Sequence, residues 1–505
     1  MIDDHEIIAF MGNDHHLSFR EIPKMLMKTE VGVPGQTSRY RPSYYLFRLI
    51  ETAVWGDHPF FWYLFRVVLF GISIFIAWRL LGRVFGLLGG LSCMILVSHS
   101  FWADIWARLG SNETYGVVGV VLYCLAFSKL WEEKRSEPTT FWWIVLAFSA
   151  ILTMGSKENF LLILSTSAVL LYQAWQHKRL TKLSFLTNGI LFAFGLFVMT
   201  ALILGLKKQG GDVYANPVAP MSRFQILIAG VFSLRQWKIQ LPFWVSLILM
   251  GISALFKKYQ PHDESASYIL RDIKRLFWIE TGLLLLWYSQ FVFYNGAWPN
   301  GSRYDFPGVL ALDLAYLFLA YTLIRILPHC IPYLKFPRAP QLGQAILGGF
   351  LVLVVLLFGF REFKLINAVS QRNSYLSRQF SHSLLKIVEE VKESPNTPIV
   401  FESHNVWDYE PIFSLQRFLS AYGVQNPLAL TLEGWSEATC KQGFEVSLAK
   451  RLKGIAEYGD LESSQDVTPR IRFYPLQTIQ QRNPCFVISF SGDSKLPCKN
   501  LGRIW

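Results

Sequence analysis

The chain has 505 residues, of which 52% are hydrophobic, and it carries a formal net charge of +12. An ordinary soluble domain is about 45–50% apolar, so the total decides little, but the concentration of apolar residues in long runs excludes a simple soluble domain. The cations are spread among these runs, which fits contact with anionic lipids and gives no case for a nucleic-acid partner.

Long apolar stretches recur through the first 360 residues, and a helix needs about 20 mostly apolar residues to cross a bilayer. The connections between them are mostly short and polar. The sequence therefore predicts a polytopic α-helical membrane protein with a transmembrane domain at 60–360. Ten spans are expected, at 60–81, 85–102, 113–130, 141–154, 158–175, 185–206, 241–256, 277–294, 306–326 and 342–360.

The loop charges orient these spans. Alternate connections, near residues 83, 129–135, 178–182, 257–275 and 325–338, collect Lys and Arg. Cytoplasmic loops are enriched in these residues, so we expect this set to face the cytoplasm, although the long basic segment 207–240 weighs somewhat against it. Segments 1–59 and 361–505 are then extracytoplasmic, as in a bacterial inner-membrane protein. Because no span or signal precedes segment 1–59, we also expect a first helix to be missing from the sequence.

Segment 1–59 is predicted to be the first extracytoplasmic loop, and it contains two amphipathic stretches. The stretch "SFREIPKMLMK" (18–28) places Phe19, Ile22, Met25 and Leu26 on one helical face. This pattern is typical of a helix lying in the lipid interface or of a surface helix packed on the protein. Residues 41–56 can form a second helix of the same kind.

Residues 361–505 have shorter apolar runs and are predicted to form one extracytoplasmic α/β domain. The stretches "PIVFES" (398–403) and "CFVISFSG" (485–492) have the composition of buried strands. Between them, residues 408–423 have helical spacing and end at a glycine, which is a common helix stop.

Cysteine usage in this domain leaves the redox state open. Cys440, Cys485 and Cys498 lie in it, and three cysteines allow at most one internal disulfide, with free thiols as the alternative. Cys93 and Cys124 lie within predicted spans and are interpreted as packing residues.

Charged residues mark the outer ends of several spans, where charge near a membrane is costly. Asp104 and Arg108 have the i,i+4 spacing of a helical ion pair. Glu113 begins a span, where the helix dipole favours a carboxylate. Lys157 and Glu158 head another span, and the dipole disfavours a lysine at that position, so Lys157 is harder to explain structurally.

Two further groups belong to the same predicted side. A loop rich in Gly, Pro and Asn (295–302) delivers Arg303 and Tyr304 to the next span, and the guanidinium fork matches a phosphate. Asp3 and Asp4 lie at the start of the chain, while Arg41 is the first residue of the second amphipathic stretch. Carboxylates that activate a hydroxyl and cations that hold a phosphate would thus share one compartment.

This arrangement resembles the GT-C superfamily of membrane glycosyltransferases. The shared features are an acidic pair in the first outer loop, an interfacial helix behind it, the Lys157–Glu158 pair, the Arg303–Tyr304 pair and an outer C-terminal domain. The layout is similar to that of protein O-mannosyltransferases and lipid A aminoarabinose transferases. The resemblance implies transfer of a sugar from a polyprenyl-phosphate donor to a glycan, lipid or protein acceptor outside the cytoplasm.

In such enzymes a loop carboxylate acts on the acceptor hydroxyl and cations neutralise the leaving phosphate. Direct displacement would invert the anomeric centre. The resemblance makes Asp3, Asp4 and Glu113 the candidate catalytic residues, with Asp3 preferred as the base. The candidate substrate-binding residues are Arg41, Lys157, Glu158, Arg303 and Tyr304. No cofactor is expected with certainty, and a divalent metal held by Asp3, Asp4 and Glu113 stays open.

Two alternatives come from other functional classes. A transporter or flippase of lipid-linked sugars would place ionisable residues near the middle of spans and show repeat symmetry. A non-catalytic envelope scaffold would need no acidic pair at the membrane edge.

Overall fold

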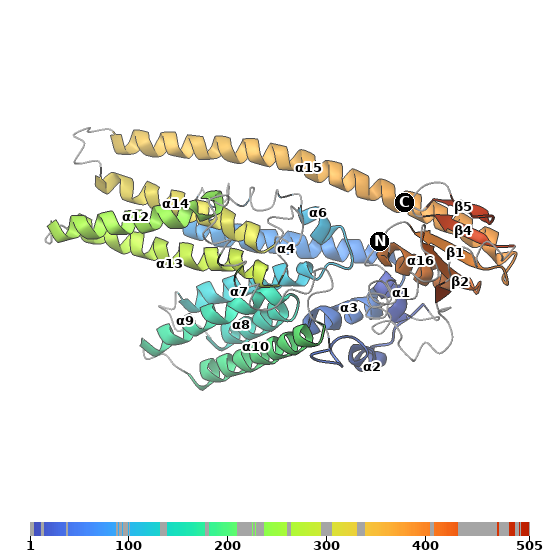
Figure 1. Ribbon diagram of the computed structural model, residues 1–505. Helices are drawn as coiled ribbons and strands as arrows, with labels where there is room; N and C mark the ends of the chain where they lie inside the picture. Colours follow the sequence, from blue (N-terminus) through green and yellow to red (C-terminus); the bar gives the residue numbers. More distant parts are fainter. Residues whose placement is uncertain are drawn as a thin grey trace.

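The structure is a computed structural model. It describes residues 5–11, 15–36, 39–86, 101–131, 139–176, 181–209, 237–259, 264–293, 306–330, 339–403, 409–432, 472–473, 484–489 and 496–503, with a few single residues between them. The protein is largely helical, and its longest helices run roughly along one direction (Figure 1). A small parallel sheet lies at one end of this bundle.

Most of the bundle helices overlap the predicted spans. They are α4 (Pro59–Phe85), α6 (Phe101–Trp106), α7 (Glu113–Trp131), α8 (Thr139–Met154), α9 (Ile163–Gln176), α10 (Lys182–Gln209), α12 (Trp237–Tyr259), α13 (Glu264–Phe293) and α14 (Gly308–Cys330). Five of them, α4, α7, α10, α12 and α14, are long and apolar enough to cross a membrane. The predicted span 85–102 falls mostly outside the described residues, and the span 158–175 begins with a short 3-10 helix, η2 (Glu158–Leu162).

Large apolar side chains cover the outside of these helices. Val67 of α4, Phe185 of α10 and Ile248 of α12 are 66%, 70% and 59% exposed. A water-soluble protein rarely exposes contiguous apolar surface of this extent. This surface is compatible with a helical membrane protein.

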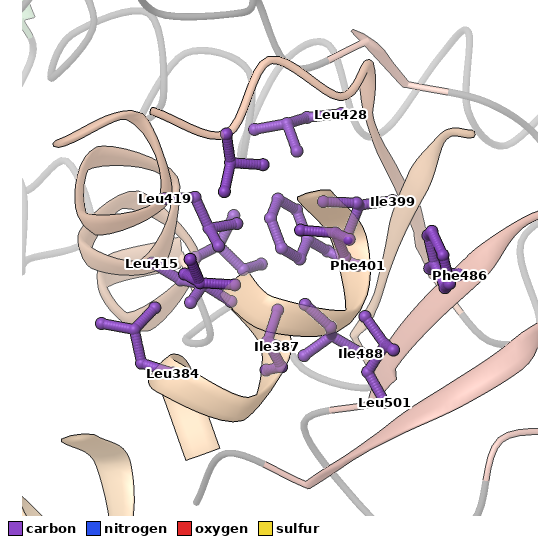
Figure 2. Close-up of a cluster of buried hydrophobic side chains, with 14 of the residues drawn as sticks. Leu384, Ile387, Ile399, Phe401, Leu415, Leu419, Leu428, Phe486, Ile488 and Leu501 are labelled. Carbon is purple, nitrogen blue, oxygen red and sulfur yellow. The ribbon is translucent and has the colours of Figure 1, made fainter. Parts of the chain in front are cut away.

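Helix α15 (Ala339–Lys392) joins the bundle to the sheet. It has 54 residues, so it is about 80 Å long at 1.5 Å per residue. It begins at the end of the bundle far from the sheet and runs the length of the molecule (Figure 1). The predicted boundary between residues 360 and 361 therefore falls inside one continuous helix. The last turns of α15 bury Phe380, Leu384 and Ile387 against the sheet (Figure 2).

The C-terminal unit has the predicted α/β character. Its strands are β1 (Ile399–Ser403), β2 (Leu428–Leu432), β3 (Arg472–Phe473), β4 (Phe486–Ser489) and β5 (Lys499–Arg503), paired in parallel in the order β3-β2-β1-β4-β5. Helix α16 (Tyr409–Ala421) and the end of α15 cover one face, where Ile399, Phe401 and Leu415 are fully buried. The predicted glycine stop is observed, because Gly423 has a φ of +75°.

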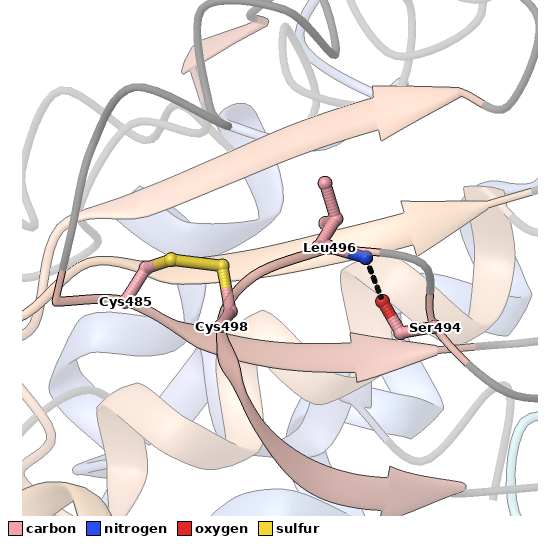
Figure 3. The surroundings of a disulfide bond; sticks show 4 residues. All are labelled: Cys485, Ser494, Leu496 and Cys498. Carbon is pink, nitrogen blue, oxygen red and sulfur yellow. Dashed lines mark hydrogen bonds between the residues drawn. A yellow bond between two sulfur atoms is a disulfide. The ribbon is translucent and has the colours of Figure 1, made fainter.

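The opposite face of the sheet contains a disulfide. Cys485 and Cys498 are bonded, 13 residues apart in sequence, beside Leu496 (Figure 3). Of the two alternatives for the domain's cysteines, an internal pair is the one observed. Cys440 lies outside the described residues, while Cys93 and Cys124 are free.

The N-terminal segment lies at the same end as the sheet. It contains α1 (His5–Met11), the 3-10 helix η1 (Phe19–Glu21), α2 (Ile22–Met27) and α3 (Pro42–Trp55). Helix α1 packs on α16, and the His15 ring nitrogen contacts the Ala421 carbonyl at 3.1 Å. Of the face predicted at 18–28, Ile22 is buried beside Leu49 and Phe19 is 60% exposed. Part of the predicted apolar face therefore packs on the protein and part of it faces outward.

Candidate functional site

Lys157 ties three distant segments of the chain together. Its Nζ donates to Glu113 Oε1 at 3.0 Å and to the Phe306 carbonyl at 2.9 Å. Glu113 begins α7, Lys157 directly precedes η2, and Phe306 begins the segment that enters α14. Both charged side chains are almost completely buried, at 0% and 2% exposure. The disfavoured lysine at the start of this helix is thus explained, since a carboxylate and a carbonyl compensate its charge.

Glu113 has no carboxylate oxygen left for solvent. Ser111 Oγ donates to its Oε2 at 2.8 Å while Lys157 occupies Oε1. Burial lowers the pKa of Lys157, and the Glu113 carboxylate opposes that shift. In this arrangement Glu113 acts first as the partner of a buried cation.

Arg41 forms a second ion pair, with Glu158, the residue that follows Lys157. Its Nε and Nη2 donate to Glu158 Oε1 and Oε2 at 2.9 and 3.2 Å, a forked geometry that suits a planar guanidinium. The backbone N–H of Arg41 also donates to Glu30 Oε1 at 2.5 Å. Burial raises the pKa of Glu30 to about 7, although the nearby Arg41 charge opposes this.

The backbone of α3 holds Arg41 in this position. The first N–H groups of a helix find no carbonyl within that helix. Here the N–H groups of Ser43 and Tyr44 donate to the Gly155 carbonyl at 2.9 and 3.1 Å. A Cβ on Gly155 would lie 2.1 Å from Ser43 Oγ. Glycine is therefore required for α3 to approach the end of α8 and the Lys157–Glu158 segment that follows.

A further buried group of charges lies on α3 and α4. Arg66 Nη2 donates to Glu51 Oε2 at 2.9 Å and to the Leu109 carbonyl at 3.2 Å. Arg48 donates to the same carbonyl and stands over the Trp62 ring. Residues 41–56 were predicted to form a second amphipathic helix, and helix α3 in this stretch buries Arg48 and Glu51 against the protein.

We call these eight residues the ion-pair cluster: Arg41, Arg48, Arg66, Lys157, Glu30, Glu51, Glu113 and Glu158. The four cations and four carboxylates balance when all are ionised. Charges are buried in proteins only when they are paired. The cluster therefore joins the N-terminal segment to the heads of the bundle helices.

Asn159, the next residue along η2, has an unusual environment. It is 1% exposed, and within the described part of the chain neither its amide oxygen nor its amide nitrogen has a hydrogen-bond partner. A buried polar group without a partner is costly, at about 1–3 kcal/mol. Asn159 therefore offers a donor and an acceptor directly beside the two ion pairs.

The structure brings together four of the predicted site residues: Arg41, Glu113, Lys157 and Glu158. Asp3, Asp4, Arg303 and Tyr304 lie outside the described residues. Asp104 and Arg108 form the predicted i,i+4 pair at 3.6 Å. Among the residues that the structure describes, no group of three or more His, Cys, Asp or Glu side chains is arranged to hold a metal.

Glu30, Arg48, Glu51, Arg66 and Asn159 were not predicted to belong to the site. For Arg48 and Glu51 a signal exists in the sequence, because they lie three apart in a stretch otherwise rich in aromatic residues. Glu30 and Asn159 carry no such signal, since their importance depends on which segments meet in space.

Comparison with known proteins gives no match, whether with protein-family models, curated proteins or solved structures.

Proposed function

We propose that this protein is a membrane glycosyltransferase. It would move a sugar from a polyprenyl-phosphate donor to an acceptor hydroxyl on the extracytoplasmic side, with inversion at the anomeric carbon. One observation carries this proposal: Lys157 contacts both Glu113 and the carbonyl of Phe306. That contact gathers the head of α7, the Lys157–Glu158 pair and the chain immediately after Arg303 and Tyr304 at one point.

The contacts of Lys157 and Arg41 suggest different roles for the predicted substrate-binding residues. Lys157 and Arg41 already neutralise Glu113 and Glu158, so we assign them to positioning rather than to direct binding of a free phosphate. Lys157 would place the residues that precede Phe306. Arg303 then remains the candidate for the donor phosphate, and Tyr304 for the sugar or the phosphate beside it.

The acceptor side of the reaction falls to Asp3 and Asp4. A hydroxyl becomes a good nucleophile when a positioned base takes its proton. Asp3 would accept that proton while the hydroxyl oxygen bonds to the anomeric carbon, and the sugar–phosphate bond breaks to release polyprenyl phosphate. Cations near the phosphate stabilise the charge that develops on it. Asn159 would supply hydrogen bonds to sugar hydroxyls.

Release of polyprenyl phosphate tests this proposal directly. The full-length protein in lipid nanodiscs would be given polyprenyl-phosphate mannose or polyprenyl-phosphate aminoarabinose, with detergent-extracted envelope as the acceptor source. We expect Arg303→Ala to raise the KM for the donor and Arg303→Lys to restore it only in part, because the fork of donors is lost. Donor use by Arg303→Ala equal to that of the wild type at limiting donor would remove Arg303 from the site.

A further inference from the structure

A pocket lies among α12, α13 and α14, apart from the ion-pair cluster. Phe243, Glu280, Trp287, Ala311 and Ala315 contribute to its wall, together with leucine and isoleucine side chains. Its empty volume is about 230 Å³, including the part that opens at the surface. Most of this is space between atoms and open solvent, and the enclosed part has room only for a group about the size of one water molecule, far less than a whole small ligand needs. It therefore suits one end of an elongated molecule.

Glu280 is the one ionisable side chain among those that line this pocket, and it is 1% exposed. Its Oε1 has no hydrogen-bond partner among the residues that the structure describes. By contrast, Gln240 on α12 and Tyr288 on α13 are paired, because the Gln240 amide donates to the Tyr288 hydroxyl at 2.9 Å. A buried polar group without a partner is costly, and more so for a carboxyl than for an amide. The unused carboxyl oxygen points to a ligand that supplies a hydrogen-bond donor.

The other side chains of the pocket wall favour one kind of hydrogen-bond donor, a cation. Phe243 and Trp287 present aromatic rings beside Glu280, and aromatic faces attract cations, whereas a hydroxyl gains no such attraction. A carboxylate and an ammonium form a charge-assisted hydrogen bond of about twice the ordinary strength. Nearby side chains on the outside of these helices are apolar, with Trp244 44% and Leu285 61% exposed. A ligand therefore reaches the pocket through the hydrocarbon of the bilayer.

We propose that this pocket binds the primary ammonium group of an amphipathic amine, whose alkyl chain lies along the leucine side chains and extends into lipid. An amine that arrives neutral takes the proton of the Glu280 carboxylic acid. The product is an ammonium–carboxylate pair with no net charge, which the apolar surroundings tolerate. This site does not depend on the proposed sugar transfer.

Binding of simple amines to the full-length protein tests the proposal. Native mass spectrometry would count bound octylamine, with octan-1-ol and octyltrimethylammonium as matched probes that lack either the charge or the N–H donors. The variants are Glu280→Gln, Ala315→Leu to fill the pocket, and Glu389→Gln on the exposed side of α15 as the matched control. We expect one octylamine per wild-type protein and per Glu389→Gln protein. Binding to Glu280→Gln should be at least about thirtyfold weaker, the loss expected when one partner of a buried charge pair is removed.

Equal binding of octylamine by wild type and Glu280→Gln would overturn the proposal, as would binding of octan-1-ol as tight as that of octylamine. A second measurement uses the wild-type protein. Dicyclohexylcarbodiimide enters bilayers and reacts with carboxylic acids in apolar surroundings, so in proteoliposomes it should label Glu280. Absence of label on Glu280 would show that the pocket does not open to lipid.

Discussion

Lys157→Met removes the buried ammonium of the ion-pair cluster and keeps a similar side-chain volume. Lys157 is 0% exposed and donates to Glu113 Oε1 at 3.0 Å and to the Phe306 carbonyl at 2.9 Å. After the change, Glu113 stays buried with Ser111 as its remaining partner in these contacts. Removing one partner of a buried ion pair typically costs about 3–5 kcal/mol, because the other charge is left uncompensated. We expect a loss of that size in the free energy of unfolding.

Two companion variants make this magnitude interpretable. Arg108→Met breaks the pair with Asp104, whose side chains are 34% and 25% exposed and 3.6 Å apart. An exposed pair of this kind contributes about 0.2–1 kcal/mol, so this variant should lose no more than that. The double variant Lys157→Met with Glu113→Gln removes the orphaned charge as well and should recover a large part of the loss, giving a clear coupling energy.

The assay is reversible unfolding in mixed micelles, followed by tryptophan fluorescence and far-UV circular dichroism. The wild type, the three variants above and the single variant Glu113→Gln would be compared at one pH and one detergent composition. The reasoning fails if Lys157→Met costs no more than Arg108→Met. It also fails if Glu113→Gln adds its own full cost to that of Lys157→Met, since the two residues would then be independent.

Three other predictions follow from the charges and crosslinks. Burial raises the pKa of Glu30 from 4.5 to about 7, so its contribution to the free energy of unfolding, about 3 kcal/mol, is full below pH 4.5 and is lost as the pH rises through 7. Glu30→Gln should remove this pH dependence from unfolding curves measured across that range. Replacing Cys485 and Cys498 by serine opens a loop of 13 residues and should cost the C-terminal unit about 3 kcal/mol, and an unchanged midpoint for loss of its native signal would contradict this. Reporter fusions after residues 180 and 400 should report opposite compartments, and a shared compartment would reverse the topology deduced from the loop charges.

Most bundle helices could be predicted because long apolar runs leave little choice of structure in a membrane. Strands β1 and β4 and helix α16 could also be predicted, because their residue patterns and the glycine stop are local features of the sequence. The length of α15 could not be predicted from apolar character, which falls after residue 360. The helix continues because no glycine or proline interrupts residues 361–394, and its last turns are stabilised by the sheet that they cover.

The site was harder to predict than the fold. Lys157 and Glu113 were selected separately for their place at span ends, but nothing local shows that they contact each other across 44 residues of chain. Arg66 was not predicted to belong to the site, because a lone arginine in an apolar run resembles a lipid-facing anchor. Its partner Glu51 lies on another helix, so the pair appears only when α3 and α4 are packed.

The most direct test of the central claim is the rate of polyprenyl-phosphate release by Asp3→Asn and Asp4→Asn in the nanodisc assay. Asparagine keeps the size and hydrogen-bonding capacity of aspartate but cannot take a proton from the acceptor hydroxyl. We predict that at least one variant loses about 10²–10⁴-fold in rate, as is typical when a general base is removed, while its unfolding free energy stays that of the wild type. Near wild-type rates in both variants would contradict the proposed mechanism.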